Sequence, residues 1–203
     1  MGMSRQRPNP RAELLRLAVA EEAARIMGEQ GIDDFLFAKR KAAERLGVTD
    51  ASILPRNTEI EAALFARRRL FSSERHDDAI AELRRSALQA MRLMADFEPR
   101  LVGPVLSGSA SPHSDINLHL FTESAEAVSM LLEDRGIPHE VLERRLKFER
   151  ERTVSYPALR FVAGQQTVEA VVFPLDGIRQ APSSPVDGKP MRRANTAEVA
   201  ALL

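Results

Sequence analysis

The sequence predicts an α+β fold, in which a helical N-terminal region is followed by a small mixed β-sheet with flanking helices. The first half of the chain carries long segments whose apolar residues recur at helical spacing. The pattern changes after Pro99, where short apolar runs bounded by Gly, Pro and Ser are typical of strands. Apolar residues make up 44% of the chain and charged residues 29%, as in soluble globular domains.

Four helices are expected in the N-terminal half, after a disordered tail at residues 1–10. The first is predicted over 11–30 and the second from Asp33 or Asp34 to Gly47, because each ends in a glycine. Residues 48–56 are predicted to form a loop, and Thr58 with Glu61 fits a capping box that opens a third helix toward Phe71. A fourth helix is expected after Ser72-Ser73. Its apolar stripe, which we interpret as core, consists of Ile80, Leu83, Ala87, Met91 and Met94.

The second half is predicted to contain strands, one helix and a hairpin. Its predicted elements, in order, are strands at 101–106 and 114–121, a helix at 124–135, a strand at 138–148, a hairpin of 157–163 and 166–173 around Gly164-Gln165, and a short helix within 196–203. The domain organisation expected from these elements is a disordered tail at 1–10, a helical region at 11–98, an α/β domain at 99–175 and an extended C-terminal tail at 176–203.

Composition excludes several classes of chemistry. The chain of 203 residues has no cysteine, so it can form no disulfide, thiolate metal site or cysteine nucleophile. Its formal net charge of +0 argues against a large dedicated nucleic-acid surface. The polar segment Met1 to Pro10 lacks a signal-peptide core, and no apolar run has the length of a membrane span. We therefore expect a cytoplasmic protein without membrane contact.

The stretch from Val105 to Phe121 holds the residues best suited to chemistry. It is predicted to be a strand, a Gly/Ser/Pro turn and a second strand. Asp115, Asn117 and His119 stand at alternate positions, so all three should project from one face of that second strand. The turn at Gly108 and Ser109 offers backbone N–H groups that a phosphate could approach closely. Together these features predict a site for a phosphate and a metal ion.

Gly108-Ser109, followed by Ser114-Asp115-Ile116-Asn117 and an apolar tail, resembles the nucleotidyltransferase signature of the DNA polymerase beta superfamily. In that family the pattern is Gly-Ser, a helical spacer, Ser-Asp-x-Asp and an apolar strand. This sequence differs at two points: Asn117 stands in place of the second carboxylate, and only Ala110 to His113 separate Gly-Ser from Ser-Asp. The resemblance covers roughly residues 100–175.

The resemblance implies a nucleotidyltransferase fold and a role for each matching residue. Asp115, Asn117 and Glu169 would hold Mg²⁺, with Asp115 and Glu169 as the catalytic carboxylates. Gly108, Ser109 and Ser114 would bind a nucleoside triphosphate. The implied function is metal-dependent transfer of a nucleotidyl group to an unknown acceptor. The alternative is a catalytically inactive, nucleotidyltransferase-like binding or regulatory module whose helical half docks a protein or nucleic-acid partner, so whether the chain is an enzyme stays open.

Two candidate residues keep a second interpretation. Glu169 lies in the otherwise apolar run 168–173, where an unpaired carboxylate would be costly. It is expected to be either a metal or phosphate ligand or the ion-pair partner of an arginine such as Arg160. His119 could serve as a metal ligand or general base, or be an ordinary surface or hydrogen-bonded histidine.

The helical half has features of its own. The basic clusters Lys39-Arg40-Lys41 and Arg67-Arg68-Arg69 are expected either to contact nucleic-acid phosphates or to form solvated helix faces. This half also resembles a family of short proteobacterial proteins of unknown function, some of which carry a muramate–alanine ligase label. The chain has neither the length nor the ATP-binding loop for that ligase reaction.

Overall fold

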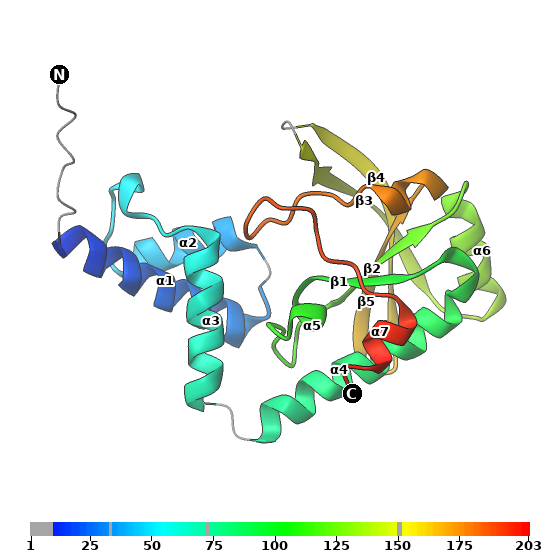
Figure 1. Cartoon of the computed structure of the whole chain (residues 1–203), viewed down its shortest axis with the longest axis horizontal. Coiled ribbons are helices and arrows are strands. Elements are labelled where there is room, and N and C mark those ends of the chain that lie inside the picture. Colours follow the sequence, from blue (N-terminus) through cyan, green and yellow to red (C-terminus); the bar gives the residue numbers. More distant parts are fainter. Residues whose placement is uncertain (1–9, 33, 72–73, 150–151) are drawn as a thin grey trace. The chain divides into compact units, whose positions relative to one another are not determined.

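The computed structural model describes residues 10–32, 34–71, 74–149 and 152–203. It confirms the α+β class, with a helical N-terminal region and a five-stranded mixed sheet flanked by helices (Figure 1). The chain divides into two compact units, and the division falls between residues 71 and 72. Within the described ranges, no helix combines the length and the apolar character that crossing a membrane would require.

The N-terminal unit contains α1 (Pro10–Gln30), α2 (Phe35–Arg45), the short 3-10 helix η1 (Ala51–Ile53) and α3 (Asn57–Phe71). Their apolar stripes close over one core, in which Val19, Ile26 and Ile60 have no exposed surface. On the surface, Arg45 of α2 pairs with Glu22 of α1 at 2.8 Å. The helices therefore pack where the apolar periodicity predicted that they would.

The start of α2 agrees with the prediction, and the start of α3 differs from it. Asp34 caps α2, because its carboxylate accepts hydrogen bonds from the N–H groups of the second and third residues that follow it. Asp33 lies outside the described residues, as does the predicted break at Ser72-Ser73. Helix α3 begins at Asn57, so Thr58 lies inside the helix and not at its predicted cap, and the Arg56 N–H donates to the side chain of Glu59 at 2.7 Å.

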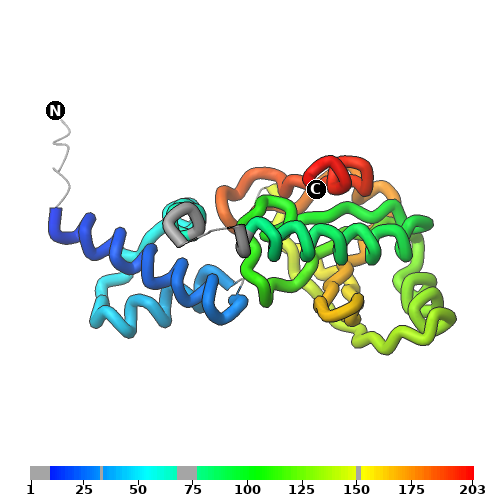
Figure 2. Tube along the Cα trace, turned by 90° about the horizontal axis from the view of Figure 1, so that it is seen from below, coloured from blue at the N-terminus to red at the C-terminus, as the bar shows by residue number. Residues whose placement is uncertain are grey.

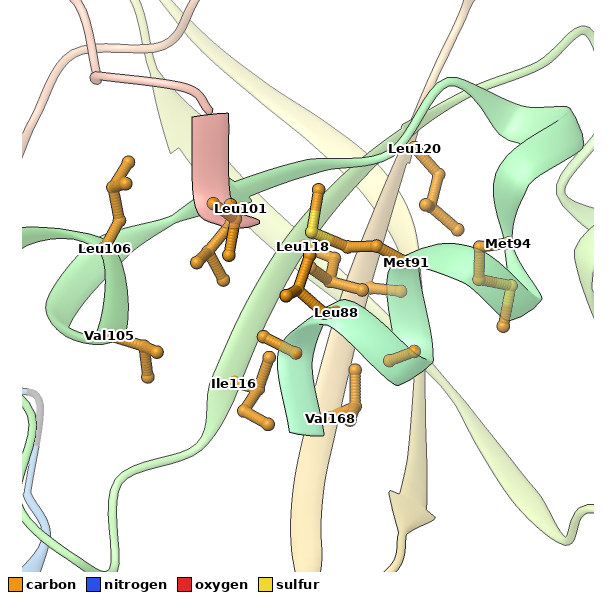
Figure 3. Packing of buried hydrophobic residues seen from close by; sticks show 14 of the residues in the cluster. Leu88, Met91, Met94, Leu101, Val105, Leu106, Ile116, Leu118, Leu120 and Val168 are labelled. Carbon is orange, nitrogen blue, oxygen red and sulfur yellow. The ribbon is translucent and has the colours of Figure 1, made fainter. Parts of the chain in front are cut away.

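Helix α4 (Glu74–Leu93) belongs to the C-terminal unit, although the sequence prediction grouped residues up to 98 with the helical region. The reason is its apolar stripe, which packs on the sheet together with α5 (Gly103–Ser107) and α7 (Thr196–Ala200). Figure 3 shows Leu88, Met91 and Met94 converging on Leu118 and Leu120. A helical pattern alone does not reveal which surface a helix covers.

The sheet of the C-terminal unit has the strand order β1-β2-β5-β4-β3. Strands β2 and β5 are parallel and all other neighbours are antiparallel. The strand bounds, in spatial order, are β1 (Arg100–Val102), β2 (Ile116–Phe121), β5 (Gln166–Phe173), β4 (Thr153–Ala163) and β3 (His139–Lys147). Helix α6 (Ala125–Asp134) connects β2 to β3, and the predicted hairpin turn at Gly164 joins β4 to β5.

The two faces of the sheet differ in chemistry. Ile116, Leu118 and Leu120 alternate on the face that packs against α4 and α6 and have no exposed surface (Figure 3). The opposite face carries Phe121 and Phe173 in a smaller apolar cluster. Because side chains alternate along a strand, this opposite face also receives Asn117, His119 and Glu169.

The strand predicted over 101–106 is wrong beyond Val102. The structure has a short helix, α5 (Gly103–Ser107), in which Val105 and Leu106 are buried. The chain turns at Gly103, whose φ of +72° is a conformation that glycine adopts readily. Pro104 then occupies the first turn of the helix, where its missing N–H costs nothing.

The segment after β5 is folded onto the unit rather than extended away from it. It contains η4 (Leu175–Arg179) and the predicted C-terminal helix, which is α7 (Thr196–Ala200). Ala194 forms a bridge with Leu101 of β1, and a capping box of Asn195 and Glu198 opens α7. Figure 2 shows α7, in red, running beside α4, where Val199 is fully buried.

Candidate functional site

Three predicted site residues share one face of the sheet. Asn117 of β2 lies directly opposite Glu169 of β5 in the parallel ladder, and Asp115 comes immediately before β2. This is the face opposite α4. The fold therefore gathers the residues that the resemblance identified as Mg²⁺ ligands, Asp115, Asn117 and Glu169, through pairing of two strands that are distant in the sequence.

Two arginines bind the carboxylates of this site. Arg144 of β3 donates to both carboxylate oxygens of Glu169 through Nε and Nη2. Arg160 of β4, which faces Glu169 in the register, donates from Nη2 to Oε2 at 3.0 Å. The same Nη2 lies 4.0 Å from Oδ2 of Asp115. Glu169 therefore forms the ion pair with Arg160, which was one of its two predicted interpretations. It also forms an ion pair with Arg144, which was not predicted.

The two carboxylates have different electrostatic surroundings. Burial acts to raise the pKa of Glu169, but the hydrogen bonds and charges of Arg144 and Arg160 outweigh it, so this pKa lies below its usual value. Burial raises the pKa of Asp115, and the charge of Glu169 adds to the rise against the opposing charges of the arginines. Of these two carboxylates, Glu169 is therefore the one whose ionised form the site stabilises.

The donor set does not fit a Mg²⁺ ion as it is arranged. Both oxygens of Glu169 are engaged by guanidinium groups, and Asn117 contributes no charge. The amide Nδ2 of Asn117 donates to the backbone oxygen of Asp115 at 3.4 Å. Across the part of the chain that the structure describes, no group of three or more acidic or histidine side chains is placed to hold a metal.

The serine-rich turn is held together by its own hydroxyl groups. Gly108 ends α5 with a φ of +79°, and the hydroxyls of Ser107 and Ser109 lie 2.8 Å apart. Ser114 is buried, and its hydroxyl accepts the Ser111 N–H at 2.9 Å. Ser114 therefore shapes the turn, which leaves Gly108 and Ser109, both partly exposed, as the residues able to meet a phosphate.

The structure also changes which glycine stands at the end of the first strand. Gly103, not Gly108, directly follows β1, and α5 lies between it and the Ser-Asp pair. A short helix thus precedes Gly108 and the Ser-Asp pair, whereas the resembled signature has its helical spacer after Gly-Ser. The residue after Gly103 is Pro104, which has neither a hydroxyl nor an N–H to offer a phosphate.

Replacement of Gly103 by alanine is expected to destabilise the protein by about 1–2 kcal/mol, because its φ is positive. A Cβ atom there would also stand 3.3 Å from Nδ2 of Asn117. Gly136→Ala is the matched control, since Gly136 has a φ of +63° and open space around it. Urea unfolding of both variants separates the two effects. Equal losses would show that contact with Asn117 costs nothing.

His119 is a buried, hydrogen-bonded histidine, one of the two interpretations left open above. It is 3% exposed, and its Nδ1 accepts a hydrogen bond from Nε of Arg193 at 3.0 Å. Burial, together with the charge of Arg193, lowers the pKa of His119 to about 3. The neutral ring, with its proton on Nε2, is therefore the stable form, and its role here is to hold Arg193.

The basic clusters of the helical unit make local contacts. Lys41 donates to the side chain of Gln30 at 2.9 Å and lies over the ring of Phe37, and Arg67 pairs with Glu29 at 3.6 Å. The side chains of Arg68 and Arg69 lie outside the described residues. These contacts are those of a solvated helix face. Docking of a protein or nucleic acid on this unit stays a prediction.

Comparison with known proteins found no family model that matches the chain and no curated protein similar to it.

Proposed function

We propose that the C-terminal unit is a nucleotidyltransferase-like module that binds a nucleoside triphosphate, and that it acts by binding rather than by efficient nucleotidyl transfer. One observation carries this proposal. The carboxylate of Glu169, beside Asp115 and Asn117, is held on both oxygens by arginine side chains. The guanidinium groups of Arg144 and Arg160 thus occupy the position that the resemblance assigns to a metal cation.

The arrangement around this cluster supports nucleotide binding. A short helix and a glycine/serine turn precede the strand that carries Asn117, and Asp115 comes immediately before that strand. The side chains of Arg144 and Arg160 are each 39% exposed. Arginine presents a planar set of donors that matches phosphate oxygens, so these two residues supply direct contacts for a triphosphate.

Three differences from the signature argue against efficient transfer. Asn117 removes one of the three negative charges that would hold divalent cations. Pro104 removes a donor near the first strand, and the guanidinium groups on Glu169 compete with any metal. Nucleotidyl transfer depends on metal ions to activate the attacking oxygen and to neutralise the leaving phosphate. A module that binds these metal ions poorly can still bind a nucleotide, but it does not transfer the nucleotidyl group efficiently.

Metal-dependent transfer with Mg²⁺ is the second candidate, and one observation favours it. Asp115 and Glu169 converge on the same nitrogen, Nη2 of Arg160, at 4.0 and 3.0 Å. If a ligand phosphate drew Arg160 away, the two carboxylates would face one position suited to a divalent cation. The acceptor for such a reaction is unknown.

Nucleotide binding is expected to raise the melting temperature with at least one of the four NTPs. A ligand that binds only the native state adds about 2.7 kcal/mol of stability at a hundredfold excess over its Kd. The shift should shrink in Arg144→Met, which removes a proposed phosphate donor, and persist in Asp134→Ala, a control because Asp134 is an exposed residue at the end of α6. The measurement is thermal unfolding with each NTP, in EDTA and in Mg²⁺. No shift under any condition would overturn nucleotide binding.

Turnover separates the two candidates. Incubation with NTP labelled at the α-phosphate, with Mg²⁺ or Mn²⁺, is expected to yield no labelled protein or small product. Label transfer that disappears in Asp115→Ala but not in Asp134→Ala would replace the binding module by the enzyme.

A further inference from the structure

We infer that Arg160 is the resident cation of this site, and that the site holds the phosphate groups of its ligand through arginine without a divalent metal. The ligand part of this inference rests on the nucleotide binding proposed above. The cation part does not, since it concerns only the side chains of the protein.

The charges of the cluster balance without a metal. Asp115 and Glu169 supply two negative charges, and Arg144 and Arg160 supply two positive charges within the same set of contacts. A Mg²⁺ site needs an excess of negative oxygen ligands to repay the loss of tightly held water. The exposed Glu140, opposite Arg160 in the β3–β4 ladder, adds a negative charge on the same face, but the two guanidinium groups that bind Asp115 and Glu169 still repel an added divalent cation.

The geometry places Arg160 between the two carboxylates. Arg160 is the β4 residue paired with Glu169 in the ladder, so the sheet itself sets its position. One nitrogen, Nη2, contacts Glu169 at 3.0 Å and reaches Asp115 at 4.0 Å. The guanidinium group of Arg160 thus lies between the carboxylates of Glu169 and Asp115, and the pairing of β4 with β5 is enough to place it there.

Both arginines retain donors for a ligand. Arg144 binds Glu169 through Nε and Nη2, and Arg160 binds it through Nη2. A guanidinium group has five N–H donors, so the Nη1 group of each side chain remains in addition to these contacts. With side chains that are 39% exposed, Arg144 and Arg160 can bind polyphosphate oxygens while Glu169 keeps them in place.

The cation part is tested with Mn²⁺ alone, by water proton relaxation. The wild-type protein is expected to bind no Mn²⁺ at millimolar concentration, because Arg160 fills the position. Arg160→Met is expected to gain a Mn²⁺ site, since Asp115 and Glu169 then lack their shared cation. Arg145→Met is the matched control, because Arg145 follows Arg144 on β3 and points to the other side of the sheet.

The ligand part is tested in EDTA by calorimetric titration of ATP and of inorganic tripolyphosphate. Wild-type affinity for ATP is expected to be the same within about twofold in EDTA and in Mg²⁺, and about tenfold lower in Arg160→Met. Tripolyphosphate separates the phosphate contacts from those of the base and sugar. If Arg160→Met does not fold by circular dichroism, Arg160→Lys keeps the charge without the planar donor set and is expected to lose ATP affinity.

The results decide the two proposals separately. Mn²⁺ binding by the wild type, or ATP binding that requires Mg²⁺, would overturn this inference and leave nucleotide binding intact. A folded Arg160→Met that neither gains Mn²⁺ nor loses ATP affinity would overturn it as well. Absence of ATP and tripolyphosphate binding, with Mn²⁺ gained in Arg160→Met, would refute the ligand and support Arg160 as the resident cation.

Discussion

Replacement of Arg193 by alanine is expected to lower the free energy of unfolding by about 2–4 kcal/mol, because one side chain makes several contacts that alanine cannot replace. Its Nε donates to Nδ1 of His119 at 3.0 Å, and its Nη1 donates to the backbone oxygen of Gly177 at 2.8 Å. The guanidinium also lies over the rings of Phe121 and Phe173, at 4.9 and 5.0 Å from their centroids. It thereby ties the C-terminal segment to the sheet.

Urea unfolding followed by circular dichroism measures this loss. Arg192→Ala is the matched control, because the neighbouring side chain is exposed. Arg193→Met, which keeps an apolar stem over the rings, should recover part of the loss. Amide exchange at Ala194, whose N–H donates to the Leu101 oxygen at 3.0 Å, should accelerate in Arg193→Ala only. Equal stability of Arg193→Ala and Arg192→Ala would refute this role.

The helices and the hairpin were predictable because their signals are local. The stripe of α4 from Ile80 to Met94 is buried as its spacing indicated, and the hairpin turns at Gly164. Residues 103–106 were predicted as strand because a short apolar run has no clear period. The informative signal was Gly103-Pro104, a pair typical of a turn into a helix.

The candidate site was predictable only in part, because it depends on which strands pair. Alternation along one strand placed Asn117 and His119 on a common face, but the position of Glu169 beside them follows from the parallel pairing of β2 and β5. Arg144 left a signal that the prediction did not use, since it stands between Leu142 and Leu146 on the half-buried face of β3. A charged residue on such a face needs a partner.

Arg193 left no signal of this kind. It lies in an irregular segment, and its contacts with His119, Phe121 and Phe173 arise only when that segment returns across the sheet. The prediction for His119 was limited for the same reason. A histidine on a strand can be a ligand, a base or a buried acceptor, and the choice depends on a residue far along the chain.

Acidification is expected to destabilise the protein through His119. Its pKa is about 3 in the folded protein, well below the usual histidine value of 6.5, because the ring is buried beside Arg193. Between these two values the unfolded chain binds more protons than the folded one, so stability falls as the pH falls below about 6.5. A proton on Nδ1 would also replace the acceptor of the Arg193 hydrogen bond with a positive charge.

The expected loss attributable to His119 between pH 7 and pH 5 is about 2 kcal/mol, measured by urea unfolding at each pH. His119→Gln should remove it, because glutamine can accept from Arg193 and does not titrate. His113→Gln, at an exposed position, is the control and should retain the loss.

Two carboxylates also contribute to the pH dependence of stability. The lowered pKa of Glu169 makes stability fall on acidification, as His119 does, and the raised pKa of Asp115 has the opposite effect. Both groups are present in every variant, so the difference between His119→Gln and wild type isolates the histidine. An unchanged pH dependence in His119→Gln would show that His119 is not the group that titrates.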